Sequence, residues 1–154
     1  DTPIQLISPL TGEARDLSQA IDPVFSSGVM GKGIVIDPSE GKLFAPVDGE
    51  VSVLFPTFHA IGITTSTGIE LLMHIGMDTV GLEGKGFTAH VKQGDKVKAR
   101  DLLISFDIDV IKAAGLITET PIIVTNQTDF DTQVIGNLPR TITQGETILT
   151  ITKN

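Results

Sequence analysis

The chain has 154 residues, 40% of them hydrophobic, and no cysteine. This length suits a single domain with a real core, which we expect to cover residues 1–154, and the lack of cysteine excludes disulfides, thiolate metal sites and a cysteine nucleophile. The formal net charge of −8 argues against nucleic acid as a partner, because binding to a phosphate backbone requires clustered lysines and arginines.

Short runs rich in Val, Ile, Thr and Phe, separated by turn residues, predict strands along the whole chain. In chain order they are Ile4–Ile7, Gly33–Ile36, Leu43–Ala45, Glu50–Phe55, Phe58–Thr65, Ile69–Ile75, Leu102–Phe106, Ile122–Thr125 and Thr147–Thr152. A short helix is predicted at Asp109–Ala114, where Gly115 would end it. Many short strands with frequent turns predict an all-β fold, in which antiparallel strands close or stack into a sandwich. No apolar run reaches the length of a membrane span, and no signal peptide is expected.

Two histidines lie in the hairpin that is predicted for residues 58–75. A loop of two or four residues would place His59 directly opposite His74 on one face of the sheet, whereas a three-residue loop would break this pairing. Because side chains alternate along a strand, Ile61 and Ile63 would share the face of His59. The two imidazoles are therefore expected to meet on a largely apolar face.

A facing histidine pair admits several interpretations. Each imidazole could be a half-buried structural residue. A metal site would need a third ligand, such as Asp78, and the sequence has no short-range metal-binding spacing. Acid–base hydrolysis would use one histidine as a base, but no Ser/His/Asp arrangement is visible. Phosphoryl transfer needs a neutral imidazole as nucleophile and a second group for the phosphoryl oxygens, and the pair supplies both.

Four stretches of the chain resemble the glucose-family IIA domains, which are phosphocarriers of the phosphoenolpyruvate-dependent sugar phosphotransferase system. They are Ser26–Gly33 (SSGVMGKG), Ala45–Gly49 (APVDG), Thr57–Ala60 (TFHA) and His74–Val80 (HIGMDTV). The resemblance extends from about Ile4 to Thr152, and the string at His74 together with the upstream histidine is highly specific. The stretches Gly86–Asp95 and Phe106–Asp109 look more like the β-glucoside permease branch.

The resemblance implies an antiparallel β-sandwich of jelly-roll character and a phosphotransferase component without cofactor or metal. It implies that His74 accepts phosphate from the small phosphocarrier HPr and passes it to a cysteine of a IIB domain, for sugar that enters through a IIC membrane domain. His59 would hydrogen-bond the phosphoryl group, Thr57 would orient one of the imidazoles, and Asp78 would shape the site. The expected location is cytoplasmic, either free or as a domain of a membrane permease.

The resemblance also implies an apolar surface around the histidines on which HPr and the IIB domain dock in turn. The expected docking residues are Val24, Phe25, Val29, Met30, Phe55, Phe58 and Leu72. Adaptable side chains such as methionine suit a surface that binds two partners. Two rival hypotheses remain: a zinc peptidase, since some metallopeptidases share a related sandwich, and a purely regulatory protein whose binding depends on phosphorylation.

Overall fold

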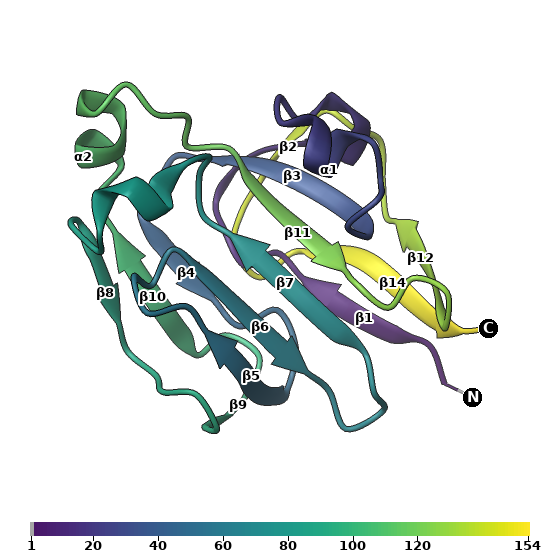
Figure 1. Cartoon of the computed structure of the whole chain (residues 1–154). Helices are drawn as coiled ribbons and strands as arrows, with labels where there is room; N and C mark the ends of the chain where they lie inside the picture. Colours follow the sequence, from purple (N-terminus) through teal and green to yellow (C-terminus); the bar gives the residue numbers. More distant parts are fainter. Residues whose placement is uncertain (1) are drawn as a thin grey trace.

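The computed structural model describes residues 2–154, and β-strands dominate its regular structure (Figure 1). The strands are β1 (Ile4–Ile7), β2 (Gly12–Asp16), β3 (Lys32–Pro38), β4 (Lys42–Phe44), β5 (Gly49–Leu54), β6 (Ala60–Thr64), β7 (Glu70–His74), β8 (Phe87–Ala89), β9 (Lys96–Val97), β10 (Leu102–Phe106), β11 (Thr120–Val124), β12 (Phe130–Val134), β13 (Arg140–Ile142) and β14 (Thr147–Lys153). The helices are α1 (Pro23–Ser26), α2 (Ile108–Ala113) and two short 3-10 helices, η1 (Leu17–Gln19) and η2 (Thr79–Leu82). The predicted all-β class with one or two short α-helices is thus confirmed.

Three antiparallel sheets form the sandwich. The largest has eight strands in the order β13-β2-β3-β11-β7-β6-β5-β9, and the two others have the orders β1-β14-β12 and β4-β10-β8. Strand β11 lies between β3 and β7, which are far from it in the sequence. This topology places β7, and with it His74, near the middle of the large sheet.

The two faces of the large sheet are covered differently. The main core holds side chains of all three sheets, among them the fully buried Leu6, Ile63, Met73 and Leu103. A smaller cluster lies on the opposite face of β3, β11 and β7, where η1 and α1 cover the sheet (Figure 1). Its buried residues are Leu17, Ala20, Phe25, Val35, Met77 and Ile123. Strands β3 and β11 contribute side chains to both clusters, because neighbouring side chains along a strand point to opposite faces of the sheet.

Several short or polar strands were not predicted. Strands β2 (GEARD), β12 (FDTQV) and β13 (RTI) carry few apolar residues, and β8 and β9 have only three and two residues. The helix α2 begins one residue before the predicted start, since the carboxylate of Asp107 accepts the N–H groups of Asp109 and Val110. The helix α1 was not predicted. Within residues 2–154, no helix is long and apolar enough to cross a bilayer.

The predicted register of the β6–β7 hairpin is wrong by one residue. The N–H of Thr65 bonds the carbonyl of Ile69, so the loop has three residues, and Ala60 rather than His59 lies opposite His74. Gly68, with a φ of 94°, supplies the left-handed conformation that such a loop needs.

The one-residue shift also overturns the prediction that Ile61 and Ile63 share a face of the sheet with the two histidines. Ile61 and Ile63 point into the main core, whereas His74 lies on the other face of the sheet, with Leu72. The apolar surroundings of His74 therefore come from the smaller cluster under α1.

Candidate functional site

The two imidazoles meet although their residues are not paired. Their ring centroids lie 5.1 Å apart and the ring planes are inclined by 79°. His74 ends β7, and His59 lies just before β6, where its carbonyl accepts the N–H of Ile75 at 2.7 Å. The preceding residue, Phe58, has a φ of 61°, so the regular alternation of β6 does not extend back to His59. This local departure from strand geometry allows the His59 ring to reach His74.

The tautomer of His74 follows from a single hydrogen bond. Its Nδ1 lies 2.7 Å from the carbonyl oxygen of Gly76, which can only accept, so Nδ1 carries the proton. In the neutral ring the lone pair is then on Nε2. Gly76 has a φ of 71°, and a Cβ there would lie 2.8 Å from the carbonyl oxygen of Ile117. The turn that holds His74 therefore requires glycine at this position.

The second imidazole is held by a hydroxyl group. The Oγ1 of Thr57 lies 2.6 Å from Nδ1 of His59, and His59 itself is buried. The ring of Phe55 packs edge-on against the His59 ring, with the centroids 5.3 Å apart. The structure thus brings Thr57, His59 and His74 together, as the sequence predicts for the three proposed catalytic residues.

The predicted docking residues divide into three groups. Val29 is 73% exposed, Val24 49% and Met30 39%, so these three side chains present apolar surface beside α1. Phe55, Phe58 and Leu72 are half-buried. Phe25 differs from the prediction: it is only 6% exposed, belongs to the small cluster, and its ring centroid lies 5.6 Å from that of His74.

Burial lowers the pKa of both imidazoles below the usual value of 6.5. The neighbouring charge of His74 lowers the pKa of His59 further. For His74, the bond to the Gly76 carbonyl and the carboxylates of Asp22 and Asp78 oppose the effect of burial, which is larger. Both rings are therefore mostly neutral at pH 7, which leaves the Nε2 lone pair of His74 free of a proton.

The surroundings of the histidine pair do not complete a metal site. Within residues 2–154, no group of three His, Cys, Asp or Glu residues is arranged to hold an ion, so Asp78 and the two histidines do not form such a group. Asp78 is exposed, adopts a left-handed φ of 59° and precedes η2.

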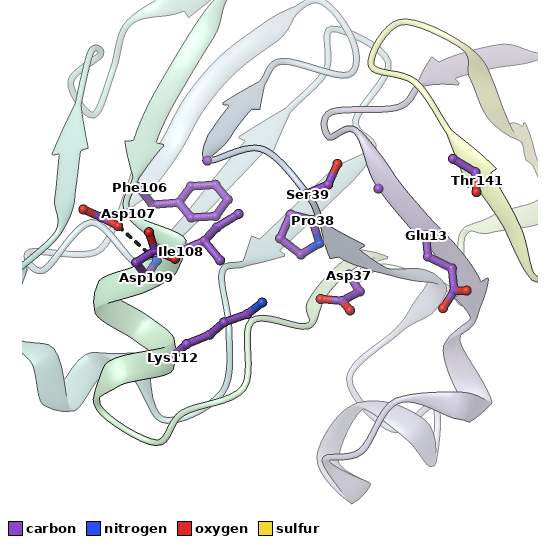
Figure 2. Close-up of a pocket in the computed structure, with 12 residues that line it drawn as sticks. Glu13, Asp37, Pro38, Ser39, Phe106, Asp107, Ile108, Asp109, Lys112 and Thr141 are labelled. Atoms are coloured by element: carbon purple, nitrogen blue, oxygen red, sulfur yellow. Dashed lines mark hydrogen bonds between the residues drawn. The ribbon is translucent and has the colours of Figure 1, made fainter.

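A hollow of about 860 Å³ lies elsewhere, among β2, β3, β13 and α2 (Figure 2). Its polar lining, from Glu13 and Asp37 to Asp109 and Lys112, contains none of the predicted site residues.

Three contacts at the site were not predicted. They are the Gly76 carbonyl at His74, the Phe25 ring against His74, and the buried Thr79 hydroxyl, which donates to the carbonyl of Ile75. Gly76 and Thr79 both belong to the HIGMDTV string, so the motif contained them without showing their contacts. No local signal joins Phe25 to His74, because the contact forms only when α1 packs on the sheet.

Comparison with known proteins gives a consistent result. Residues 4–130 match the family described as phosphoenolpyruvate-dependent sugar phosphotransferase system, EIIA 1. The β-glucoside-specific EIIBCA component of Halalkalibacterium halodurans is 51% identical over 149 residues, which are 97% of this chain and 23% of that protein. The glucose-specific EIIA component of Bacillus anthracis is 46% identical over 142 residues, which are 92% of this chain and 86% of that protein.

A solved structure, glucose permease IIA from Mycoplasma capricolum, has a TM-score of 0.89 to this chain at 34% identity and covers 97% of this chain and 96% of its own. The chain spans less than a quarter of the length of the β-glucoside relative but most of the glucose-specific EIIA component. These relationships do not favour the zinc peptidase hypothesis. The chain belongs to the EIIA 1 family of the phosphoenolpyruvate-dependent sugar phosphotransferase system, whose members carry phosphoryl groups in sugar uptake.

Proposed function

We propose that the chain is a single cytoplasmic IIA domain that carries a phosphoryl group on Nε2 of His74. The observation that carries this proposal is the bond from Nδ1–H of His74 to the Gly76 carbonyl. It directs the lone pair to Nε2, and the lowered pKa keeps that lone pair free of a proton at pH 7. A fixed tautomer and a neutral ring are the properties that a phosphoryl-accepting histidine needs.

Transfer consists of two displacements at phosphorus. The lone pair on Nε2 of His74 attacks the phosphoryl group of phospho-HPr, the new N–P bond forms, and the bond to the donor imidazole breaks with its electron pair. The cysteine thiolate of a IIB domain then attacks the same phosphorus, and the electron pair returns to Nε2 of His74. Because each leaving group is an imidazole nitrogen, the carrier itself needs no proton transfer at Nε2.

His59 stabilises the charge on the phosphoryl oxygens. When the hydroxyl of Thr57 donates to Nδ1 of His59, the neutral ring carries its proton on Nε2 and can donate it in a hydrogen bond. The short distance between the two rings places this donor beside a phosphoryl group on His74. Such preorganised donors are a large source of rate enhancement where charge develops.

The partners follow from the family and from the exposed apolar side chains. We propose that HPr and a IIB domain dock on Val24, Val29 and Met30, next to the histidines. The identity of 58% over 119 residues to the β-glucoside-specific EIIBCA component of Bacillus subtilis supports a role in β-glucoside uptake. Any contact with a membrane would be indirect, through an associated IIC domain.

Reconstitution tests the proposal directly. The domain is incubated with phosphoenolpyruvate, enzyme I and HPr, and its intact mass is measured. We expect the mass of one phosphoryl group to be added, in a linkage that is stable to base and labile to acid, as a phosphohistidine is. No mass gain, or a gain that survives acid, would contradict the assignment.

The lowered histidine pKa values predict how stability changes with pH. The unfolded chain has imidazole pKa values of about 6.5. Because the pKa values of both histidines are lower in the folded chain, the unfolded chain binds more protons at any pH between the folded and the unfolded pKa values. The stabilisation is therefore complete above about pH 6.5 and is lost as the pH falls through the folded pKa values. Urea midpoints measured from about pH 7.5 to about pH 5.5 should fall for the wild type. They should fall less for the His59→Gln/His74→Gln variant, and equal losses would contradict the assignment of the pKa shifts.

A charge on the exposed apolar surface should weaken the docking of HPr without slowing the phosphoryl-transfer step itself. We expect Val29→Asp to raise the half-saturating concentration for phosphoryl acceptance by about tenfold, which corresponds to the loss of one buried apolar contact. The maximal rate and the fold should be unchanged, since Val29 is exposed and lies outside the buried clusters.

Thr141→Asp is the matched control. Thr141 lies on β13, four strands from β7 in the sheet and hence about 19 Å away. It should leave both kinetic parameters as in the wild type. Equal effects of the two variants would show that the added charge acts through the overall field rather than through docking.

A further inference from the structure

Glu119 is a buried carboxylate that the proposed chemistry does not use. It lies directly before β11 and is only 2% exposed. One carboxylate oxygen lies 3.1 Å from Nη1 of Arg15 on β2, and the other accepts the backbone N–H of Ile21 at 2.7 Å. We propose that Glu119 is a positioning residue that fixes the segment from Ile21 to Met30, and thus the partner-docking side chains, relative to His74.

Residues next to Glu119 in the sequence connect the turn after His74 with the segment that carries α1. The carbonyl of Ile117 accepts the N–H of Met77 at 3.0 Å, in the turn whose Gly76 holds the His74 ring. Two residues later, Glu119 holds Ile21 at the start of the segment that carries α1. Residues 117–119 therefore set the separation between the histidine turn and the docking segment.

Few other polar contacts hold this segment. Among the hydrogen bonds of residues 2–154, only one other joins residues 17–30 to a segment beyond the adjoining strands, from Nε2 of Gln127 to the carbonyl of Gly28 at 3.1 Å. The remaining attachment is the packing of Leu17, Ala20 and Phe25 in the small cluster. Loss of the Glu119 acceptor would leave the Ile21 N–H without its partner at the N-terminal end of the segment.

If Glu119 acted only as an ion-pair partner of Arg15, its negative charge would matter rather than the oxygen that accepts the Ile21 N–H. Arg15 also contacts Glu13 at 2.7 Å and Asp37 at 3.5 Å, and the hydrogen bond to Glu13 raises the pKa of Arg15. The charge of Arg15 thus has other partners, whereas the Ile21 N–H has only the Glu119 oxygen among its side-chain contacts. Positioning depends on that oxygen, and ion pairing depends on the charge.

The test measures phosphoryl acceptance from phospho-HPr at increasing concentrations of the full chain. This inference rests on the proposed function. For Glu119→Ala we expect the half-saturating concentration to rise by about tenfold, as for the loss of one hydrogen bond to a charged group. The maximal rate should stay within about twofold, because the Gly76 carbonyl still holds His74. Glu119→Gln keeps an oxygen for Ile21 and should restore most of the affinity.

Two further variants complete the design. Glu13→Gln is the matched control, because it removes a carboxylate from Arg15 without touching Ile21, and it should behave as the wild type. If Glu119→Ala does not fold, the double variant Arg15→Met/Glu119→Leu replaces the partly buried ion pair with apolar side chains, a change that folds in other proteins, and again removes the acceptor. The same rise in half-saturating concentration is expected for it.

The outcomes separate the inference from the proposed function. An unchanged half-saturating concentration in the folded Glu119→Ala protein, or no recovery in Glu119→Gln, would overturn the positioning role. A wild type that accepts no phosphate would overturn the proposed function instead. In that case the contact between the Phe25 and His74 rings, followed by NMR in wild type and Glu119→Ala, still tests positioning: it should weaken in the variant, and an unchanged contact would refute the role.

Discussion

A His74→Ala protein is expected to accept no phosphate from phospho-HPr. The substitution removes the nucleophilic Nε2, and loss of a nucleophile lowers rates by several orders of magnitude. The neighbouring His59 cannot replace it, because its ring is buried, bound at Nδ1 to Thr57 and stacked edge-on against Phe55. Incubation with phosphoenolpyruvate, enzyme I and HPr, followed by intact-mass analysis, measures the effect.

The third histidine of the chain supplies the control. His90 is exposed and its Nε2 bonds the hydroxyl of Ser105 at 2.7 Å, away from the histidine pair. His90→Ala should be phosphorylated as fully as the wild type. Normal phosphorylation of His74→Ala would overturn the present assignment, and loss of phosphorylation in His90→Ala would assign the carrier function to His90 instead.

Substitution of His59 by glutamine should separate the two half-reactions. Acceptance requires the lone pair of His74, which this change leaves in place, so the protein should still become phosphorylated. Onward transfer to the IIB cysteine should slow by about 10²- to 10³-fold, the usual effect of removing one donor that stabilises transition-state charge. Rapid-quench measurements with isolated phosphorylated domain and a IIB domain determine the rate of this second step alone.

Thr57→Val refines the same test. It keeps the volume of the side chain but removes the hydroxyl that lies 2.6 Å from Nδ1 of His59. The ring stays in place with a less defined orientation, so onward transfer should slow by less than in His59→Gln. If Thr57→Val were slower than His59→Gln, the threonine would be acting on the phosphoryl group itself rather than through the imidazole.

The sequence predicted which side chains gather better than it predicted the geometry around them. The TFHA and HIGMDTV strings contain Thr57, His59 and His74, and the structure brings these three side chains together. The pairing of the two histidines depended on the length of one loop, and a single glycine conformation at Gly68 decided it differently from the prediction. The rings meet for another reason, the left-handed backbone at Phe58, which no side-chain pattern reveals.

Contacts between residues far apart in the sequence could not be predicted from local sequence patterns. Arg15 and Glu119 are 104 residues apart. Locally each looks like an ordinary polar residue, Arg15 within the polar strand β2 and Glu119 just before β11. Phe25 reads as part of an apolar loop, and only the packing of α1 on the large sheet turns it from a docking residue into a buried neighbour of His74. The strands that were missed are polar because they have a solvent-exposed face or lie near a sheet edge.

The pairing of β1 with β14 has a consequence for how such a module can be joined to others. Both chain ends leave the same end of the sandwich (Figure 1). There Ile4 and Lys153 line a hollow together with Thr67 and Ile69, from the segment between β6 and β7. His74 is at the other end of β7, about 14 Å along the strand. A flexible tether at either terminus would thus raise the effective concentration of an attached partner to the millimolar range, on the order of 10⁻³ M, without covering His74.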